Sequence, residues 1–242
     1  MAKLLGLPMI EHVYRRVSLN TQLSLTAVAT CDQEIADYVK SFGGRAVMTS
    51  DRHERASDRC AEALETIERM EGTRCDIVVM VQGDEPMIYP EMISEAVEPM
   101  IKDPTVLVTN LLGKIRSLEE FRDRNCIKVV CDLQGRALYF SREPIPTRSR
   151  INHIPMGKQI CVIPFRRDFL FEYTRMKPTP LEMAESVDMM RVLEHGLKVH
   201  MAATKFETQS VDTLEDLKMV EALLERDPLY LSHFAHKRAG FP

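Results

Sequence analysis

The chain has 242 residues, 45% of them hydrophobic, and a formal net charge of −4. This length suits a single domain, and the hydrophobic fraction is sufficient for a complete core. The slightly acidic balance argues against a protein that binds nucleic acid through bulk electrostatics. No apolar run approaches the length of a membrane span. We therefore expect neither a nucleic-acid partner nor a membrane partner.

The metal-binding and redox residues are dispersed. The six cysteines show no Cys-x-x-Cys spacing, and the seven histidines form no cluster. Because the N-terminus lacks the plan of a signal peptide, reduced thiols are favoured over disulfides or zinc ligands. We expect a cytoplasmic protein without a zinc site.

In the first half of the chain, predicted helices alternate with predicted strands. Helices are expected over Met9–Val17, over Asp32–Phe42, after an N-cap at Ser57, and over Pro90–Ile101. Strands are expected over Leu23–Ala29, over Arg45–Met48, in an apolar run that ends at Gln82, and over Val106–Leu112. This rhythm predicts an α/β fold with a doubly wound, mostly parallel sheet.

The rhythm changes at Ile127. The runs Ile127–Cys131 and Arg136–Phe140 flank a turn with Gly135, which predicts an antiparallel hairpin. A further strand is expected over Ile160–Phe165. We interpret residues 127–165 as an antiparallel arm inserted into the fold, and we expect a dimer contact there.

The alternation then returns. A helix over Ser186–His195, a strand over Lys198–Ala203 and a helix over Leu214–Leu224 are predicted, the last with a Thr213–Asp216 capping box. Residues 227–242 are predicted to form a peripheral tail. The whole chain, residues 1–242, is therefore interpreted as one domain.

The strand that ends at Gln82 carries the most informative motif. It runs directly into Gly83-Asp84-Glu85-Pro86, so Asp84 is expected in the crevice beyond the carboxyl end of a parallel strand. A carboxylate placed there commonly holds a divalent cation together with substrate phosphates. The alternative is that Asp84 caps the helix that begins near Pro90.

Further motifs occur in a fixed order along nearly the whole chain. They are Val81-Gln82-Gly83-Asp84-Glu85-Pro86, Lys128-Val129-Val130, Ala137-Leu138-Tyr139-Phe140-Ser141-Arg142-x-x-Ile145-Pro146 and Val211-Asp212-Thr213-x-Glu215-Asp216-Leu217. In order and spacing the chain resembles the 3-deoxy-manno-octulosonate (Kdo) cytidylyltransferases, the CMP-Kdo synthetases of lipopolysaccharide assembly. The resemblance implies CMP transfer from CTP to a 2-keto-3-deoxy sugar acid, with Mg²⁺ as cofactor and a homodimer as the assembly.

The resemblance also implies roles on the metal and nucleotide side of a site. Asp84 and Asp212 match the two catalytic, metal-binding carboxylates, and Asp212 likewise stands between an apolar strand and a helix. Gln82 and Arg59 match positions that line the cytidine nucleotide pocket. The alternative for Arg59 is a solvated helix face.

Four further residues are candidate substrate contacts. Ser141 and Arg142 correspond to positions at the sugar-acid site, where a guanidinium can bind a carboxylate through two parallel hydrogen bonds. Arg142 could instead pair with Glu143 or Asp132 at the strand ends. Lys128 could face either the crevice or bulk water. Gln159 stands where Kdo enzymes have a sugar-contacting histidine.

The chain departs from the family pattern at three places. It begins with a segment that matches the sequence just after the family's phosphate-binding strand and loop, and no Gly-rich phosphate motif replaces that loop. We therefore expect open strand edges and weak or absent activity, which leaves a non-catalytic dimeric scaffold as an alternative. Gln159 and the pair Asp188-Met189 change the sugar side, so the acceptor could also be a different 3-deoxy or nonulosonic acid.

Overall fold

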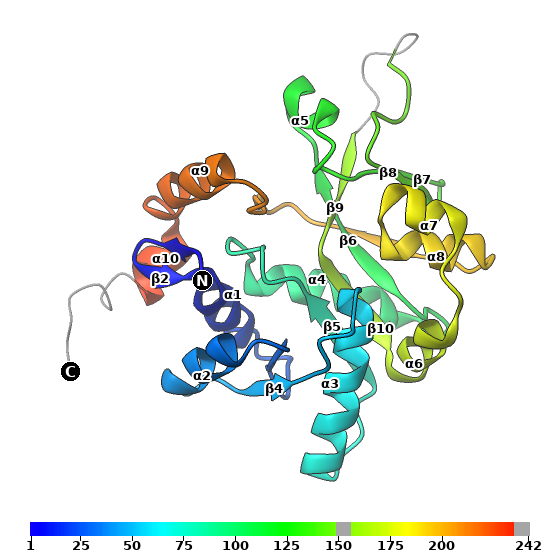
Figure 1. Cartoon of the computed structure of the whole chain (residues 1–242). Coiled ribbons are helices and arrows are strands. Elements are labelled where there is room, and N and C mark those ends of the chain that lie inside the picture. Colours follow the sequence, from blue (N-terminus) through cyan, green and yellow to red (C-terminus); the bar gives the residue numbers. More distant parts are fainter. Residues whose placement is uncertain (149–155, 235–242) are drawn as a thin grey trace.

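Helices and strands alternate along the computed structural model, which describes residues 1–148 and 156–234 (Figure 1). The helices are α1 (Met9–Ser18), α2 (Gln33–Ser41), α3 (Ala56–Glu71), α4 (Pro90–Lys102), α5 (Leu118–Arg122), α6 (Arg167–Arg175), α7 (Pro180–Glu185), α8 (Asp188–Glu194), α9 (Leu214–Leu224) and α10 (Pro228–His233). The strands are β1 (Lys3–Leu4), β2 (Leu7–Pro8), β3 (Val28–Thr30), β4 (Ala46–Met48), β5 (Ile77–Val81), β6 (Thr109–Lys114), β7 (Lys128–Cys131), β8 (Ala137–Ser141), β9 (Gly157–Ile160), β10 (Val162–Arg166) and β11 (His200–Ala203).

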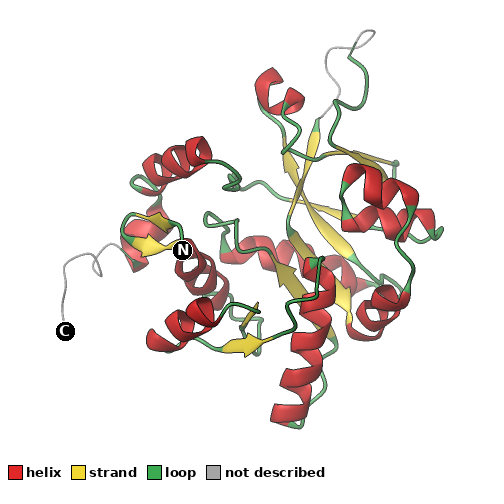
Figure 2. Cartoon of the chain, in the orientation of Figure 1, coloured by secondary structure: helices red, strands yellow, loops and turns green. Residues whose placement is uncertain are grey.

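The predicted α/β architecture is confirmed, with helices packed around a mixed set of strands (Figure 2). Parallel pairs join β3 to β4 and β6 to β11. Antiparallel pairs join β10 to β5, and β9 to both β6 and β7. Apart from the short β1–β2 hairpin, every antiparallel strand pair among the described residues includes a strand of the segment that the sequence predicts as an insertion.

The hairpin of the inserted segment is also confirmed. Strands β7 and β8 pair antiparallel, with Val129 opposite Phe140. The single strand expected over residues 160–165 is instead two strands that pair with different neighbours. The chain bends at Cys161, whose carbonyl accepts a hydrogen bond from Gln82 N at 3.2 Å. This bend brings the insertion against the turn that carries Asp84.

Strands β3 and β5 each pair on one side only within the described residues. The predicted strand over residues 23–29 is confined to β3, because only Val28, Ala29 and Thr30 find partners in β4. A strand without a neighbour has no ladder to satisfy its backbone groups.

The described part of residues 227–242 packs against the rest of the chain. Tyr230 and Phe234 are buried and belong to a hydrophobic cluster with Leu4, Leu5 and Leu224. Residues 235–242 lie outside the described range. In Figure 1, α9 and α10 lie beside the N-terminal hairpin and α1, away from the large sheet.

One capping prediction is wrong. Helix α3 begins at Ala56 after Arg55, so Ser57 is inside the helix and not at its N-cap. The Ser57 hydroxyl is buried and donates to Asp188 Oδ2 at 2.9 Å, which joins α3 to α8. The Thr213–Asp216 capping box of α9 is confirmed. No helix among the described residues is both long and apolar enough to cross a membrane.

Candidate active site

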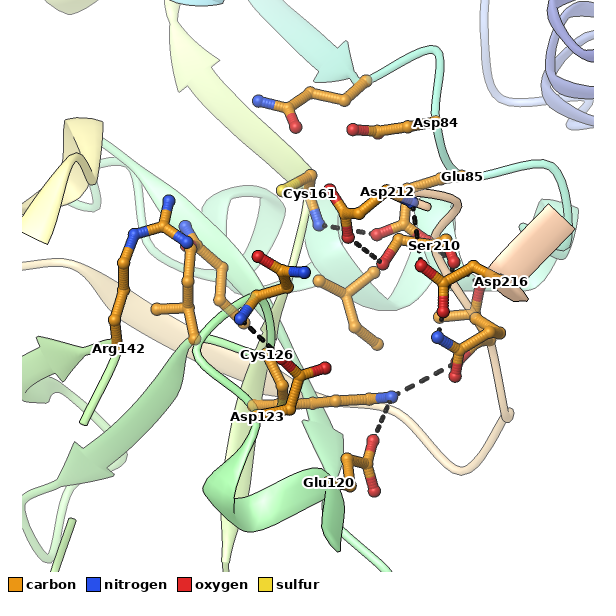
Figure 3. A pocket seen from close by; sticks show the side chains of 18 residues that line it. Asp84, Glu85, Glu120, Asp123, Cys126, Arg142, Cys161, Ser210, Asp212 and Asp216 are labelled. Carbon is orange, nitrogen blue, oxygen red and sulfur yellow. Dashed lines mark hydrogen bonds and ion pairs between the residues drawn. The ribbon is translucent and has the colours of Figure 1, made fainter. Parts of the chain in front are cut away.

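Asp84 and Asp212 come together from segments that are far apart in the sequence. Asp84 lies in the turn after β5, and Asp212 lies just before α9. The two segments are joined by a backbone hydrogen bond of 2.9 Å from Val211 N to Asp84 O. Figure 3 shows both side chains on one side of a shared pocket, with Arg142 on the other side.

The electrostatics of the pair agree with this proximity. Burial raises the pKa of the Asp84 carboxyl, and the negative charge of Asp212 adds to the rise. Asp84 Oδ1 is buried and has no hydrogen-bond partner among the described residues. Two neighbouring carboxylates of which one has a buried, unpartnered oxygen form an arrangement that a cation would stabilise.

The pocket collects residues from five regions of the chain. Its lining residues come from the turn after β5, from the segment around α5, from the end of β8, from β9 and its bend, and from the segment that leads to α9. They are Gln82, Asp84, Glu85, Glu120, Asp123, Asn125, Cys126, Ile127, Arg142, Lys158, Gln159, Ile160, Cys161, Thr208, Gln209, Ser210, Asp212 and Asp216. Five of the eight predicted site residues therefore line one pocket: Gln82, Asp84, Arg142, Gln159 and Asp212.

The donor set fits a hard cation that is shared with substrate. No group of three or more potential ligands is found in the described part of the chain, so the site offers a pair of carboxylates. Mg²⁺ is usually bound through one or two carboxylates, with substrate phosphates and water completing its octahedron. Asp84 and Asp212 suit that role. The capping alternative for Asp84 fails, because the N-cap of α4 is Tyr89.

Arg142 is oriented by its own chain but keeps free donors. Its side chain donates to the carbonyls of Glu185 at 2.6 Å, Arg124 at 3.0 Å and Ser186 at 3.4 Å. These bonds use three of the five N–H groups of a guanidinium. The remaining two are available to a carboxylate in the pocket. Arg142 therefore pairs with backbone carbonyls and not with the neighbouring acids considered above.

Lys128 is buried behind the residues that line the pocket and does not line it itself. Its side chain is fully buried. Its ammonium group donates to the carbonyls of Asp123 and Cys126, both at 2.6 Å, and of Arg142 at 2.5 Å. These three bonds use every donor that a lysine has. The predicted substrate contact of Lys128 therefore finds no support, and its role is to hold three pocket residues in place.

Two further predicted residues lie outside the pocket lining. The Ser141 hydroxyl is buried and donates to Glu185 Oε1 at 3.1 Å. Arg59 donates to Thr49 Oγ1 at 2.6 Å and to Ser50 O at 3.2 Å, which fixes the loop after β4. Arg59 is therefore not on a solvated face. Met189, which the sequence places on the sugar side, is instead buried in the largest hydrophobic cluster.

Several pocket residues were missed by sequence reasoning. Lys158 donates to Glu120 Oε1 at 2.6 Å across the pocket wall. Helix α5, which carries Glu120, was not predicted because it is only five residues long. Glu85 follows Asp84 directly, and its place in the same motif was the available signal. Glu85 is 4% exposed and accepts a hydrogen bond from Thr208 Oγ1 at 3.1 Å.

Replacing Glu85 with glutamine is expected to change how stability depends on pH. Burial, aided by the charge of Asp84, raises the pKa of Glu85 from 4.5 to about 7. Between these values the folded protein binds more protons than the unfolded chain, so this group's contribution to stability is lost as pH rises. Relative to the parent, the unfolding free energy of the Glu85→Gln variant should rise by roughly 1–3 kcal/mol from pH 4.5 to pH 8. Urea unfolding at both pH values in EDTA measures this difference, and a pH-independent difference would contradict the assignment.

Comparisons with known proteins agree with this geometry. Residues 1–229 match the family model described as cytidylyltransferase. The 3-deoxy-manno-octulosonate cytidylyltransferase of Geobacter metallireducens is 43% identical, with 92% of this chain and 90% of that protein covered. The protein of the same name from Solibacter usitatus is 38% identical, with 93% and 87% covered.

Solved structures give the same result. A CMP:2-keto-3-deoxy-manno-octonic acid synthetase complexed with CTP superposes with a TM-score of 0.82 at 33% identity, covering 93% of this chain and 90% of that one. A 4-diphosphocytidyl-2C-methyl-D-erythritol synthase from Anaerococcus prevotii, at 14% identity and a TM-score of 0.57, shares the fold. The fold and the matched family model define a nucleotidyltransferase of the cytidylyltransferase class. The chain belongs to the family of 3-deoxy-manno-octulosonate cytidylyltransferases.

Proposed function

We propose that this protein transfers CMP from CTP to Kdo, or to a closely related 2-keto-3-deoxy sugar acid, with release of pyrophosphate, for the synthesis of lipopolysaccharide or another surface polysaccharide. The observation that carries the proposal is the convergence of Asp84 and Asp212 on one pocket. The names of the relatives with the same fold support the choice of substrates.

In the proposed reaction, the anomeric hydroxyl of the sugar acid forms a bond to the α-phosphorus of CTP. The bond between that phosphorus and the pyrophosphate oxygen breaks, and the hydroxyl proton leaves to solvent. Asp84 and Asp212 would hold Mg²⁺ against the triphosphate. When bound, this ion offsets the negative charge that grows on the phosphate oxygens.

The chain's own residues would orient both substrates. Gln82 lies next to the carboxylates and suits the nucleotide. The two free N–H groups of Arg142 suit the carboxylate of the sugar acid, a group that neutral sugars lack. Lys128 supports this end by fixing the backbone of Arg142.

We also propose that the chain forms a homodimer through the segment 127–165. Leu133 and Leu138, both on the β7–β8 hairpin, are exposed large apolar side chains and support such a contact. Residues 149–155 of this segment lie outside the described range. Sedimentation equilibrium of the purified chain measures the mass, and a monomer at high micromolar concentration would remove this part of the proposal.

The test of the function is pyrophosphate release from CTP with Mg²⁺ and a panel of keto-sugar acids. Release that requires a sugar acid and stops in EDTA is the expected result, with Kdo among the accepted substrates. Calorimetric measurement of CTP binding distinguishes the enzyme from the scaffold alternative, because a scaffold would bind no CTP in the presence of Mg²⁺.

A further inference from the structure

Asn110 is a buried amide whose orientation is fixed by the backbone. It lies on β6 and is fully buried. Its Nδ2 donates to Ile160 O at 2.8 Å and to Leu111 O at 3.1 Å. Exchanging the oxygen and the nitrogen of this amide would place an acceptor against two carbonyl oxygens. Asn110 Oδ1 must therefore point away from them.

The fixed oxygen of Asn110 in turn fixes Gln159. Gln159 Nε2 donates to Asn110 Oδ1 at 2.6 Å. The backbone of Gln159 is held as well, because its N–H donates to Ile127 O at 2.9 Å. A flipped glutamine amide would oppose two oxygens, so Gln159 must keep its NH₂ group on Asn110. The Oε1 atom of Gln159 therefore points away from Asn110.

Gln159 Oε1 is left as an acceptor beside the pocket. Gln159 is half-buried and lines the pocket together with Arg142 and Lys158. No described residue donates a hydrogen bond to this oxygen.

We propose that Asn110 orients Gln159 so that Gln159 Oε1 faces the pocket as a hydrogen-bond acceptor, and that this acceptor selects sugar acids with a hydroxyl group at the facing position. The inference rests on the proposed function and specifies its acceptor. Gln159 is then a specificity residue, and Asn110 is a positioning residue that acts through it. A site that hydrogen-bonds a substrate hydroxyl discriminates strongly against the analogue that lacks it.

The experiment combines monodeoxy analogues of the accepted sugar acid with two variants. In the parent protein, removal of one particular hydroxyl should lower kcat/KM by about 10–100-fold, as expected for the loss of one hydrogen bond to a half-buried group. In Gln159→Met, which is close in volume but has no polar group, that analogue and the full sugar acid should be used almost equally. The KM for CTP should stay unchanged, which excludes a general loss of structure.

Asn110→Leu tests the positioning role. Without Asn110 the Gln159 amide can rotate, so discrimination against the same analogue should fall to an intermediate value. Gln22→Met, in the exposed turn after α1 and outside the pocket lining, is the matched control for a glutamine-to-methionine change and should behave like the parent.

The outcomes of this experiment are distinguishable from those of the functional test. If the parent uses a sugar acid but Gln159→Met keeps the full penalty for every missing hydroxyl, the acceptor role is wrong while the proposed function stands. A rise in the KM for CTP that matches the loss for the sugar acid would also refute it. If the parent uses no sugar acid, both proposals fail.

Discussion

The Asp84→Asn and Asp212→Asn variants should each release pyrophosphate from CTP about 10²–10³-fold more slowly than the parent. The substitution keeps the size of the side chain but removes the charge that a cation needs. Removal of one electrostatic contact to a transition state typically costs a factor of this size. Asp84 has a buried oxygen without a partner, so we expect its loss to have the larger effect. Steady-state rates over a range of Mg²⁺ concentrations measure both.

Unfolding cannot account for the expected loss. Asp212 raises the pKa of Asp84 by charge repulsion, so either substitution relieves a repulsion in the metal-free protein. The melting temperature in EDTA should therefore stay the same or rise. Asp76→Asn, on an exposed residue outside the pocket, is the control and should leave the rate unchanged. Near-parental rates for Asp84→Asn would remove the metal role from this site.

The position of Asp84 in the pocket was predictable because it depends on local rules. An apolar run predicts a buried strand, and a strand end followed by glycine and an acid predicts a carboxylate in the crevice. Asp84 follows this rule directly. Asp212 was found through motif order, and the long-range contact between Val211 and Asp84 that joins the two segments has no local signal.

The roles of buried cations were not predictable in the same way. Lys128 lies on a strand, and strand alternation indicates only which face it occupies. Its ammonium group instead reaches three carbonyls that come from residues 123, 126 and 142. Arg59 likewise binds the loop after β4. A lysine or arginine that donates hydrogen bonds to backbone carbonyls of its own chain has the same sequence signature as one that binds a substrate.

The bend at Cys161 shows a further limit of sequence reasoning. The apolar run Ile160–Phe165 predicts one strand. The chain divides there because β9 pairs with β6 and β7, whereas β10 pairs with β5. Such a division is decided by partners far away in the sequence. It also places Gln159 against Asn110, a contact that neither segment reveals by itself.

The largest effect on stability is expected for Asp227→Asn, at about 3–5 kcal/mol of unfolding free energy. Asp227 forms an ion pair with Arg16, and both side chains are almost completely buried. Tyr89 Oη also donates to Asp227 Oδ1 at 2.6 Å, so the carboxylate joins α1, the start of α4 and α10. Neutralising Asp227 would leave the Arg16 charge buried without a counter-charge, which is the costly step.

A double-mutant cycle separates the burial of that charge from the loss of packing. Arg16→Met should cost less than Asp227→Asn, because Asp227 keeps Tyr89 and the first N–H groups of α10 as donors. Arg16→Met combined with Asp227→Asn should recover part of the loss, since no unpaired charge remains. Arg45→Met is the control: its ion pair with Glu71 is exposed, so the change should cost at most about 1 kcal/mol. Urea unfolding of the four variants at pH 7 gives these values. If Asp227→Asn costs no more than Arg45→Met, the buried pair does not anchor α10 to the rest of the fold.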